Sequence, residues 1–339
     1  MMPITRELSQ KITNMGLFCA CLVVLRHVCF EGPFALLGNV LTNGYAHIGV
    51  PFFFAASGFF LAGHVGEDGW WRREVRKRLK TVLVPYFVWC VLGIVLLAPL
   101  SMAADRLAGR AFGASVGLLN GHALRAFGLQ LNEMPAIVPL WFLRELFLLV
   151  LCSPWIVWLV KRIGMRWLLF VFVIVCVMPY VSDSDFWGLG GVLQCCFRPD
   201  GLFYFSVGIG LRMRRGLERR PMSVGPAFAG VILLFFAMIL RIPLRSVAVI
   251  VAVPFLLLAT WSFVPSGELP RVFAGVAFPI YLIHPIVLGW TGSLANLCHI
   301  PVTYRAFIDW PAATIAPIAI VFCMRRCCPR FASIAFGGR

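Results

Sequence analysis

Ten long apolar segments, each continuous, constrain the fold of this chain more than any other feature. A helix that crosses a bilayer needs about 20 apolar residues, whereas a membrane-spanning strand alternates apolar and polar positions over about ten residues. The continuous segments therefore predict an all-α, polytopic transmembrane helical bundle of about ten spans. The segments are residues 14–30, 47–65, 79–102, 139–160, 167–181, 201–211, 224–240, 246–264, 271–291 and 306–324.

Composition excludes the main alternatives to a membrane bundle. Apolar residues make up 60% of the chain and charged residues 13%, whereas soluble domains have about 45–50% and about 25%. A soluble globule could not bury this much apolar surface, and disordered chains are polar. No segment is large enough for a separate soluble domain, so residues 1–339 are predicted to form a single integral-membrane domain.

The excess of basic residues indicates how the spans are oriented. The net charge is +16, from 30 Lys and Arg against 14 Asp and Glu, and Lys and Arg are retained on the cytoplasmic side of membranes. With the N-terminus in the cytoplasm, the cytoplasmic segments hold about three times as many basic residues as the outer segments. We therefore expect both termini to be cytoplasmic and the long segment 103–138 to face outward.

The sequence lacks the patterns of common metal and nucleotide sites. The twelve cysteines have no zinc-site spacing, and no H-E-x-x-H or P-loop motif is present. Most cysteines lie inside apolar segments, where they behave as small apolar residues. We therefore expect no bound cofactor and no metal ion.

Five ionisable residues lie well inside the apolar segments, away from the segment ends, and such groups are costly in a membrane and commonly functional. Arg26 and His27 lie in the first segment, Arg144 and Glu145 in the fourth, and His284 in the ninth. The predicted orientation places all three sites at similar depth, toward the outer face. Histidine can transfer protons near neutral pH, and arginine can stabilise an oxyanion. Alternatively, these residues join helices by hydrogen bonds, or Arg26 extends to the outer interface.

Ser57 and the basic stretch 70–80 each allow two interpretations. Ser57 precedes a glycine inside the second segment, where small residues usually allow close helix packing, although its hydroxyl could also line a pocket. The basic stretch contains Arg73, Arg76 and Arg78. It could set the orientation and attract anionic lipid, or it could bind the phosphates of a nucleotide-bearing donor such as coenzyme A.

Six motifs occur in order along about 270 residues of the chain. They read L-V-V-L-R-H at 22–27, I-G-V-P-F-F-F-A-A-S-G-F-F-L at 48–61, K-R-L-K-T-V-L-V-P-Y at 77–86, P-L-W-F-L-R at 139–144, F-Y-F-S-V-G at 203–208 and F-P-I-Y-L-I-H-P at 278–285. Each motif is weak alone. In this order and spacing, they resemble the acyltransferase 3 family of integral-membrane O-acyltransferases.

The resemblance implies an acyl-CoA donor on the cytoplasmic side and an acceptor hydroxyl at or beyond the outer face, usually on a glycan or lipid-linked sugar. It implies that His27 is the catalytic base and that Arg73, Arg76 and Arg78 of the basic stretch handle the donor. Two positions depart from the family pattern. Gly16 stands where many members have an arginine, and Pro279 replaces the usual serine.

We therefore expect a bacterial inner-membrane O-acyltransferase, with O-acetyl transfer as the leading hypothesis. His27 would take the proton of a sugar hydroxyl, which attacks the thioester of acetyl-CoA or another acyl-CoA. Arg144 or Arg26 would stabilise the oxyanion, and His284 would position the acceptor. The residues assigned to the substrate pocket are Arg26, Ser57 and Glu145.

A non-catalytic transporter or flippase for a lipid-linked sugar is the alternative hypothesis, because the same polar residues could bind a moving sugar. Transporters usually contain internal repeats, and none is visible in this sequence. The expected partners are the acyl-CoA donor, the carbohydrate acceptor and the bilayer. Nucleic acid is not expected, because membrane orientation explains the basic charge.

Overall fold

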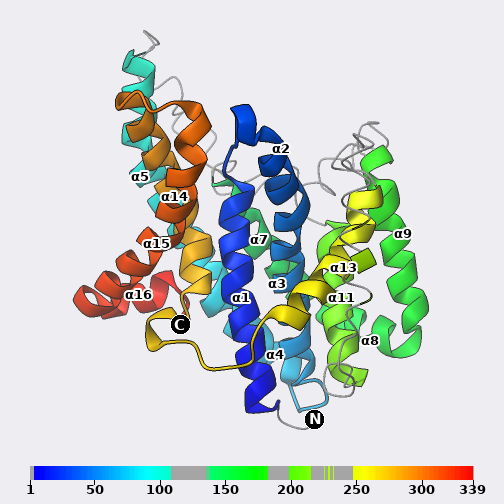
Figure 1. Cartoon of the computed structure of the whole chain (residues 1–339). Coiled ribbons are helices and arrows are strands. Elements are labelled where there is room, and N and C mark those ends of the chain that lie inside the picture. Colours follow the sequence, from blue (N-terminus) through cyan, green and yellow to red (C-terminus); the bar gives the residue numbers. More distant parts are fainter. Residues whose placement is uncertain are drawn as a thin grey trace.

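The computed structural model describes residues 4–107, 137–181, 198–214 and 247–338, together with a few isolated positions between them. Most of the predicted outer segment 103–138 and of the predicted span 224–240 lies outside these ranges. The described chain is helical and contains no strand, so the all-α prediction is confirmed for it. The helices stand side by side as a bundle (Figure 1).

The described elements follow one another in chain order. They are α1 (Arg6–Arg26), η1 (Gly32–Phe34), α2 (Ala35–Gly38), η2 (Asn39–Gly44), η3 (Tyr45–Ile48), α3 (Gly49–Ala62), α4 (Trp70–Arg78), η4 (Leu79–Leu83), α5 (Val84–Leu107), η5 (Val138–Leu140), α7 (Trp141–Leu151), α8 (Ser153–Arg162), α9 (Met165–Val181), α11 (Pro199–Arg214), α13 (Val247–Phe263), η7 (Arg271–Phe273), α14 (Ala277–Leu297), α15 (Val302–Cys327) and α16 (Pro329–Ala335).

Five helices of the described chain are long and apolar enough to cross a membrane. They are Arg6–Arg26, Gly32–Ala62, Trp70–Leu97, Ala277–Leu297 and Val302–Cys327. A sixth candidate is the pair α7 and α8, which is bent by 65°. The chain is therefore a multi-pass helical protein by length and composition, and the number of ten spans stays a prediction.

Helix α1 shows why its ends differ from the predicted span 14–30. The helix begins earlier, at Arg6, because the Thr5 hydroxyl accepts a hydrogen bond from the backbone N–H of Leu8 at 3.3 Å. It ends at Arg26, since the backbone of His27 is no longer helical, with φ −100° and ψ 6°. His27 therefore lies at the end of the helix, and not within it.

Two glycines allow α3 and α11 to pack with their backbones in contact. A Cβ atom on Gly58 would lie 2.1 Å from the carbonyl oxygen of Phe205, and one on Gly208 would lie 1.9 Å from that of Ala55. Only glycine permits such an approach. The structure therefore agrees with the packing interpretation of the Ser57–Gly58 pair.

Contacts between segments that are distant in sequence show which segments lie at the same end of the bundle. At one end, Arg6 pairs with Glu268, and the Asn14 amide donates hydrogen bonds of 2.8 Å to the carbonyl oxygens of Pro265 and Gly267. At the other end, the ring of Phe34 packs against that of Phe307. Each contact joins segments predicted to share one side of the membrane; which side is cytoplasmic stays a prediction.

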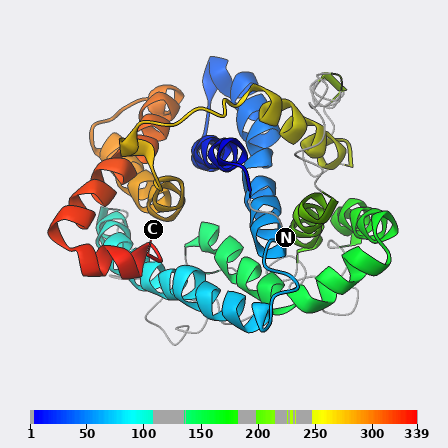
Figure 2. The ribbon, with the colours of Figure 1, turned by 90° about the horizontal axis from the view of Figure 1, so that it is seen from below.

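Helix α1 occupies a central place in the bundle. It packs against α14, α3 and α15. Seen along the bundle, α1, α3, α7 and α14 surround its middle, with α9, α13, α15 and α16 farther out (Figure 2). This arrangement brings the end of α1 against helices that are distant in sequence.

Candidate functional site

His27 and His284 lie next to each other, although 257 positions separate them in the sequence. Their ring centres are 5.3 Å apart and their planes are tilted by 36°. His27 follows the last residue of α1, and His284 stands in the first half of α14, which packs along α1. The structure thus brings together two of the three residues predicted to be catalytic.

The two histidines differ in exposure. His27 is exposed, whereas the side chain of His284 is 0% exposed. The Nδ1 atom of His284 lies 3.1 Å from the carbonyl oxygen of Ile280 one turn earlier, and its Nε2 atom has no hydrogen-bond partner. Pro285 has no backbone N–H, so the carbonyl oxygen of Tyr281 lacks its usual donor in the helix. This carbonyl oxygen lies close to the imidazole of His284. A substrate would therefore meet His27 before His284.

Aromatic rings connect this histidine pair to α7. The ring of Tyr281 lies 6.1 Å from that of His284 and 5.6 Å from that of Phe142. The Tyr281 hydroxyl donates a hydrogen bond to the carbonyl oxygen of Pro139 in η5. These contacts fix the face of α14 that carries His284.

Arg26 lies beside His27 at the exposed end of α1. Its guanidinium donates a hydrogen bond to the side-chain oxygen of Asn43 in η2, and Asn43 in turn bonds Asn39 at 2.8 Å. Its charge therefore stands at the rim of the site. Stabilisation of an oxyanion by Arg26 stays a prediction.

Arg144 and Glu145 are both buried on α7 but face different neighbours, as their adjacent positions on a helix predict. Arg144 lies close enough to Cys90 of α5 for an electrostatic interaction. Glu145 accepts a hydrogen bond from the backbone N–H of Arg198, and its Oε1 atom lies 2.9 Å from where a Cβ on Gly201 would stand. Glu145 therefore belongs to the contact between α7 and α11.

An ion pair at the start of α11 was not predicted from the sequence. Arg198 donates to both carboxylate oxygens of Asp200, at 3.1 and 3.0 Å, and its guanidinium lies 4.4 Å from the ring centre of Trp141. His47 of η3 interacts with the charges of Arg198 and Asp200. The one sequence signal was Pro199 followed by Asp200, a pattern typical of a helix start.

Ser57 does not lie at the level of the histidine pair. A Cβ on Gly49, the first residue of α3, would lie 3.0 Å from the carbonyl oxygen of Cys19 in α1. Ser57 lies eight residues farther along α3, about 12 Å toward the end of the bundle that carries α4. The described residues show no contact that joins Ser57 to His27, and the role of Ser57 in the substrate pocket stays a prediction.

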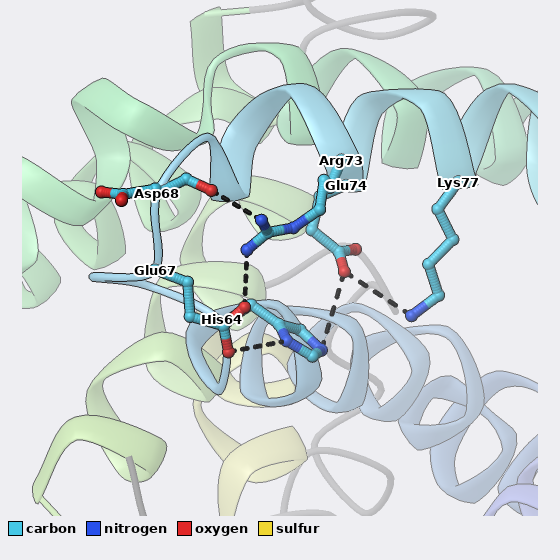
Figure 3. A network of polar contacts seen from close by, with 6 residues as sticks. All are labelled: His64, Glu67, Asp68, Arg73, Glu74 and Lys77. Atoms are coloured by element: carbon cyan, nitrogen blue, oxygen red, sulfur yellow. Dashed lines mark hydrogen bonds and ion pairs between the residues drawn. The ribbon is translucent and has the colours of Figure 1, made fainter.

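A polar network connects the end of α3 to α4 (Figure 3). The Arg73 guanidinium lies 2.6 Å from the Glu67 carboxylate and donates a 2.6 Å hydrogen bond to the carbonyl oxygen of Asp68. His64 lies 3.5 Å from Glu67 and 3.8 Å from Glu74. Arg73, predicted to bind the donor, thus also holds the loop that leads into α4.

Glu74 is the buried centre of this network. It lies 3.5 Å from Lys77 and 3.6 Å from Arg78, which is also buried. Arg76 points outward and is exposed. Of the three arginines predicted to handle the donor, Arg73 and Arg76 are therefore both exposed, whereas Arg78 neutralises a buried carboxylate.

Gly16 is buried within α1 and faces α3. A Cβ atom there would lie 3.8 Å from Phe52 and 3.9 Å from Phe53, which are ordinary contact distances. Gly16, one of the two positions that depart from the family pattern, therefore lies against aromatic side chains.

Residues 13–326 match the model of the acyltransferase 3 family, which is described as an acyltransferase domain. A curated relative, the succinoglycan biosynthesis protein ExoH of Rhizobium meliloti (strain 1021), is 27% identical over 170 residues. The match covers 46% of this chain and 44% of the relative, so it spans less than half of that protein. No solved structure matches the chain. Because the family match covers nearly the whole chain, this protein belongs to the acyltransferase 3 family.

Proposed function

We propose that this protein transfers an acyl group, with acetyl as the leading candidate, from acyl-CoA to a hydroxyl of a cell-surface or lipid-linked carbohydrate. The observation that carries the proposal is the pair of His27 and His284 at the end of α1, in a chain of the acyltransferase family. The name of the relative connects that protein to succinoglycan biosynthesis, which supports a glycan acceptor. The proposed location is a bacterial inner membrane.

In the proposed reaction, His27 is the general base. It takes the proton of the acceptor hydroxyl while the oxygen attacks the thioester carbonyl. The new C–O bond forms, the C–S bond breaks, and His27 returns the proton to the leaving sulfur of coenzyme A. His27 suits this role because its exposed imidazole lies beside the buried His284.

The other predicted residues take supporting roles in this proposal. Arg26 is next to the base and Arg144 is the buried cation of α7, so either could stabilise the oxyanion. Arg76 is exposed on α4 and would bind the phosphates of the donor, together with Arg73 and Arg78. Glu145 would support the acceptor side through Arg198.

The test uses membranes that contain the protein, radiolabelled acetyl-CoA and the glycan of the host strain. Release of coenzyme A and label in the glycan should both require the protein and the acceptor. His27→Ala should lower the rate by about 10²–10⁴-fold, as expected for loss of a general base. His27→Gln should be nearly as inactive, because an amide cannot carry a proton.

The matched control is His299→Asn, at an exposed histidine beyond the end of α14 with φ 52°, a conformation that asparagine tolerates. This variant should keep full activity. Substantial transfer by inserted and folded His27→Ala protein would overturn the assignment of the base. Glycan mass spectrometry of a deletion strain should show loss of one acyl mass; an unchanged glycan would instead favour a transport function.

A further inference from the structure

His284 carries a polar atom that the bundle core leaves without a partner. Its side chain is 0% exposed, and its Nε2 atom makes no hydrogen bond. A buried polar atom without a partner costs free energy, so it needs an explanation. The nearest ring that could supply a donor is that of His27, at a centre distance of 5.3 Å.

The tautomer of His284 follows from its other nitrogen. Nδ1 lies 3.1 Å from the carbonyl oxygen of Ile280, and a carbonyl oxygen can only accept. Nδ1 therefore carries the hydrogen. A neutral imidazole with hydrogen on Nδ1 has a bare lone pair on Nε2, so Nε2 is an acceptor and not a donor.

The separation of the rings suits a hydrogen bond between the two imidazoles. A ring nitrogen lies roughly 1.1 Å from the ring centre, so a direct N–H···N bond of about 3 Å needs a centre distance of about 5.2 Å. The observed 5.3 Å differs little from that value. Because His27 lies at a helix end and is exposed, its side chain is free to rotate so that a ring nitrogen faces Nε2 of His284.

We infer that His284 is a positioning residue whose Nε2 atom accepts a hydrogen bond from a ring N–H of His27. This inference rests on the proposed function, in which His27 is the general base. The bond holds the hydrogen on the inner nitrogen of His27 and leaves the outer nitrogen bare toward the acceptor hydroxyl. A base oriented by a third group is the arrangement that nucleophilic catalysis commonly uses.

This role differs from direct contact with the acceptor. His284 is fully buried, and its ring centre lies 5.3 Å from that of the exposed His27. In the proposed reaction, the acceptor therefore contacts His27 and not His284. When His27 takes the hydroxyl proton, both of its nitrogens carry hydrogen, and His284 continues to accept from the inner one. No proton leaves the pair until His27 gives it to the sulfur of coenzyme A.

Three substitutions separate this role from a purely structural one. His284→Gln places an amide oxygen near the position of Nε2, whereas His284→Asn reaches only to the position of Nδ1. His284→Leu removes both polar atoms. We expect Asn and Leu to lower kcat about tenfold with the acceptor KM unchanged, the effect of one lost hydrogen bond, and we expect Gln to restore most of the rate.

Equal rates for the Gln and Asn variants would overturn the inference. A rise in the acceptor KM at unchanged kcat would also overturn it, because that result means direct acceptor binding. Rates are compared only among variants that give the same yield of monodisperse protein in detergent.

A second measurement needs no change at position 284. In protein labelled with ¹⁵N-histidine, we expect one imidazole in the Nδ1–H tautomer, and we expect its Nε2 resonance to shift in His27→Ala. An imidazole at position 284 that carries hydrogen on Nε2, or a resonance that His27→Ala leaves unchanged, would refute the bond. Because the spectrum does not depend on turnover, it tests the inference even if His27→Ala remains active and the proposed function fails.

Discussion

The contact between α3 and α11 gives a prediction whose size follows from the geometry. In Gly208→Ala, the new methyl group would lie 1.9 Å from the carbonyl oxygen of Ala55. Real Cβ atoms essentially never approach another atom within 3.0 Å, so the two helices must separate by more than 1 Å. Backbone atoms cannot rotate away as a side chain does. Such overpacking costs about 1–3 kcal/mol.

Gly210→Ala is the matched control on the same helix. A Cβ there would lie 3.9 Å from Val160, which is ordinary contact, and Gly210 is also buried. Both substitutions gain about 1 kcal/mol from the higher helix propensity of alanine. This gain cancels when the variants are compared. We expect Gly208→Ala to be less stable than Gly210→Ala by about 1–3 kcal/mol, the cost of overpacking alone.

The assay is thermal or denaturant unfolding in detergent, followed by the fluorescence of the 11 tryptophans. Gly58→Ala should resemble Gly208→Ala, because its methyl group would lie 2.1 Å from the carbonyl oxygen of Phe205. Equal stability of Gly208→Ala and Gly210→Ala would mean that α3 and α11 do not pack backbone to backbone.

Three further outcomes are expected. Arg76→Ala should raise the acyl-CoA KM by up to about fivefold with the acceptor KM unchanged, because an exposed charge contact contributes about 1 kcal/mol or less; unchanged donor kinetics would favour a role in membrane orientation. Ser57→Ala should keep at least half of the activity, and a larger loss in folded protein would contradict the packing role. Reporter fusions at Glu67 and Gly117 should give opposite orientations, and identical orientations would disprove the predicted topology.

Hydropathy predicted the helices of the described residues well but their ends less well. The predicted first span starts at residue 14, yet α1 begins at Arg6, because a Thr5 cap and the bonds of Asn14 to the 265–267 segment stabilise a polar helical start. The fourth predicted span was drawn straight, but it bends by 65° between α7 and α8. Pro154 in the first turn of α8 marks this break, which the continuous apolar sequence concealed.

The candidate site was predictable where polar residues interrupt apolar segments. His27 and His284 stood out for that reason, and the predicted topology placed them at similar depth. Arg198 and Asp200 did not stand out, since they precede an apolar segment and a charged residue there is common. Their importance comes from contacts with Trp141 and His47, which belong to other elements and which no local pattern indicates.

The long axis of the bundle separates the predicted donor end from the proposed base. Val23 of α1 lies level with Gly49, the first residue of α3. From this level, His27 lies four residues farther along α1. Ala62, the last residue of α3, lies thirteen residues from Gly49 in the opposite direction. At 1.5 Å per residue in upright helices, these segments give about 25 Å between the two levels. Helix α4 lies toward the lower end of the bundle (Figure 1). Phosphates bound by Arg76 and a hydroxyl activated by His27 therefore cannot share one contact site. Only the extended arm of the donor, or the acyl group itself, can join them.

Substitutions at the α4 end should therefore change the donor KM, whereas substitutions at His27 should change kcat. An Arg76 variant that lowers kcat as strongly as a His27 variant would show that the two ends do not work separately.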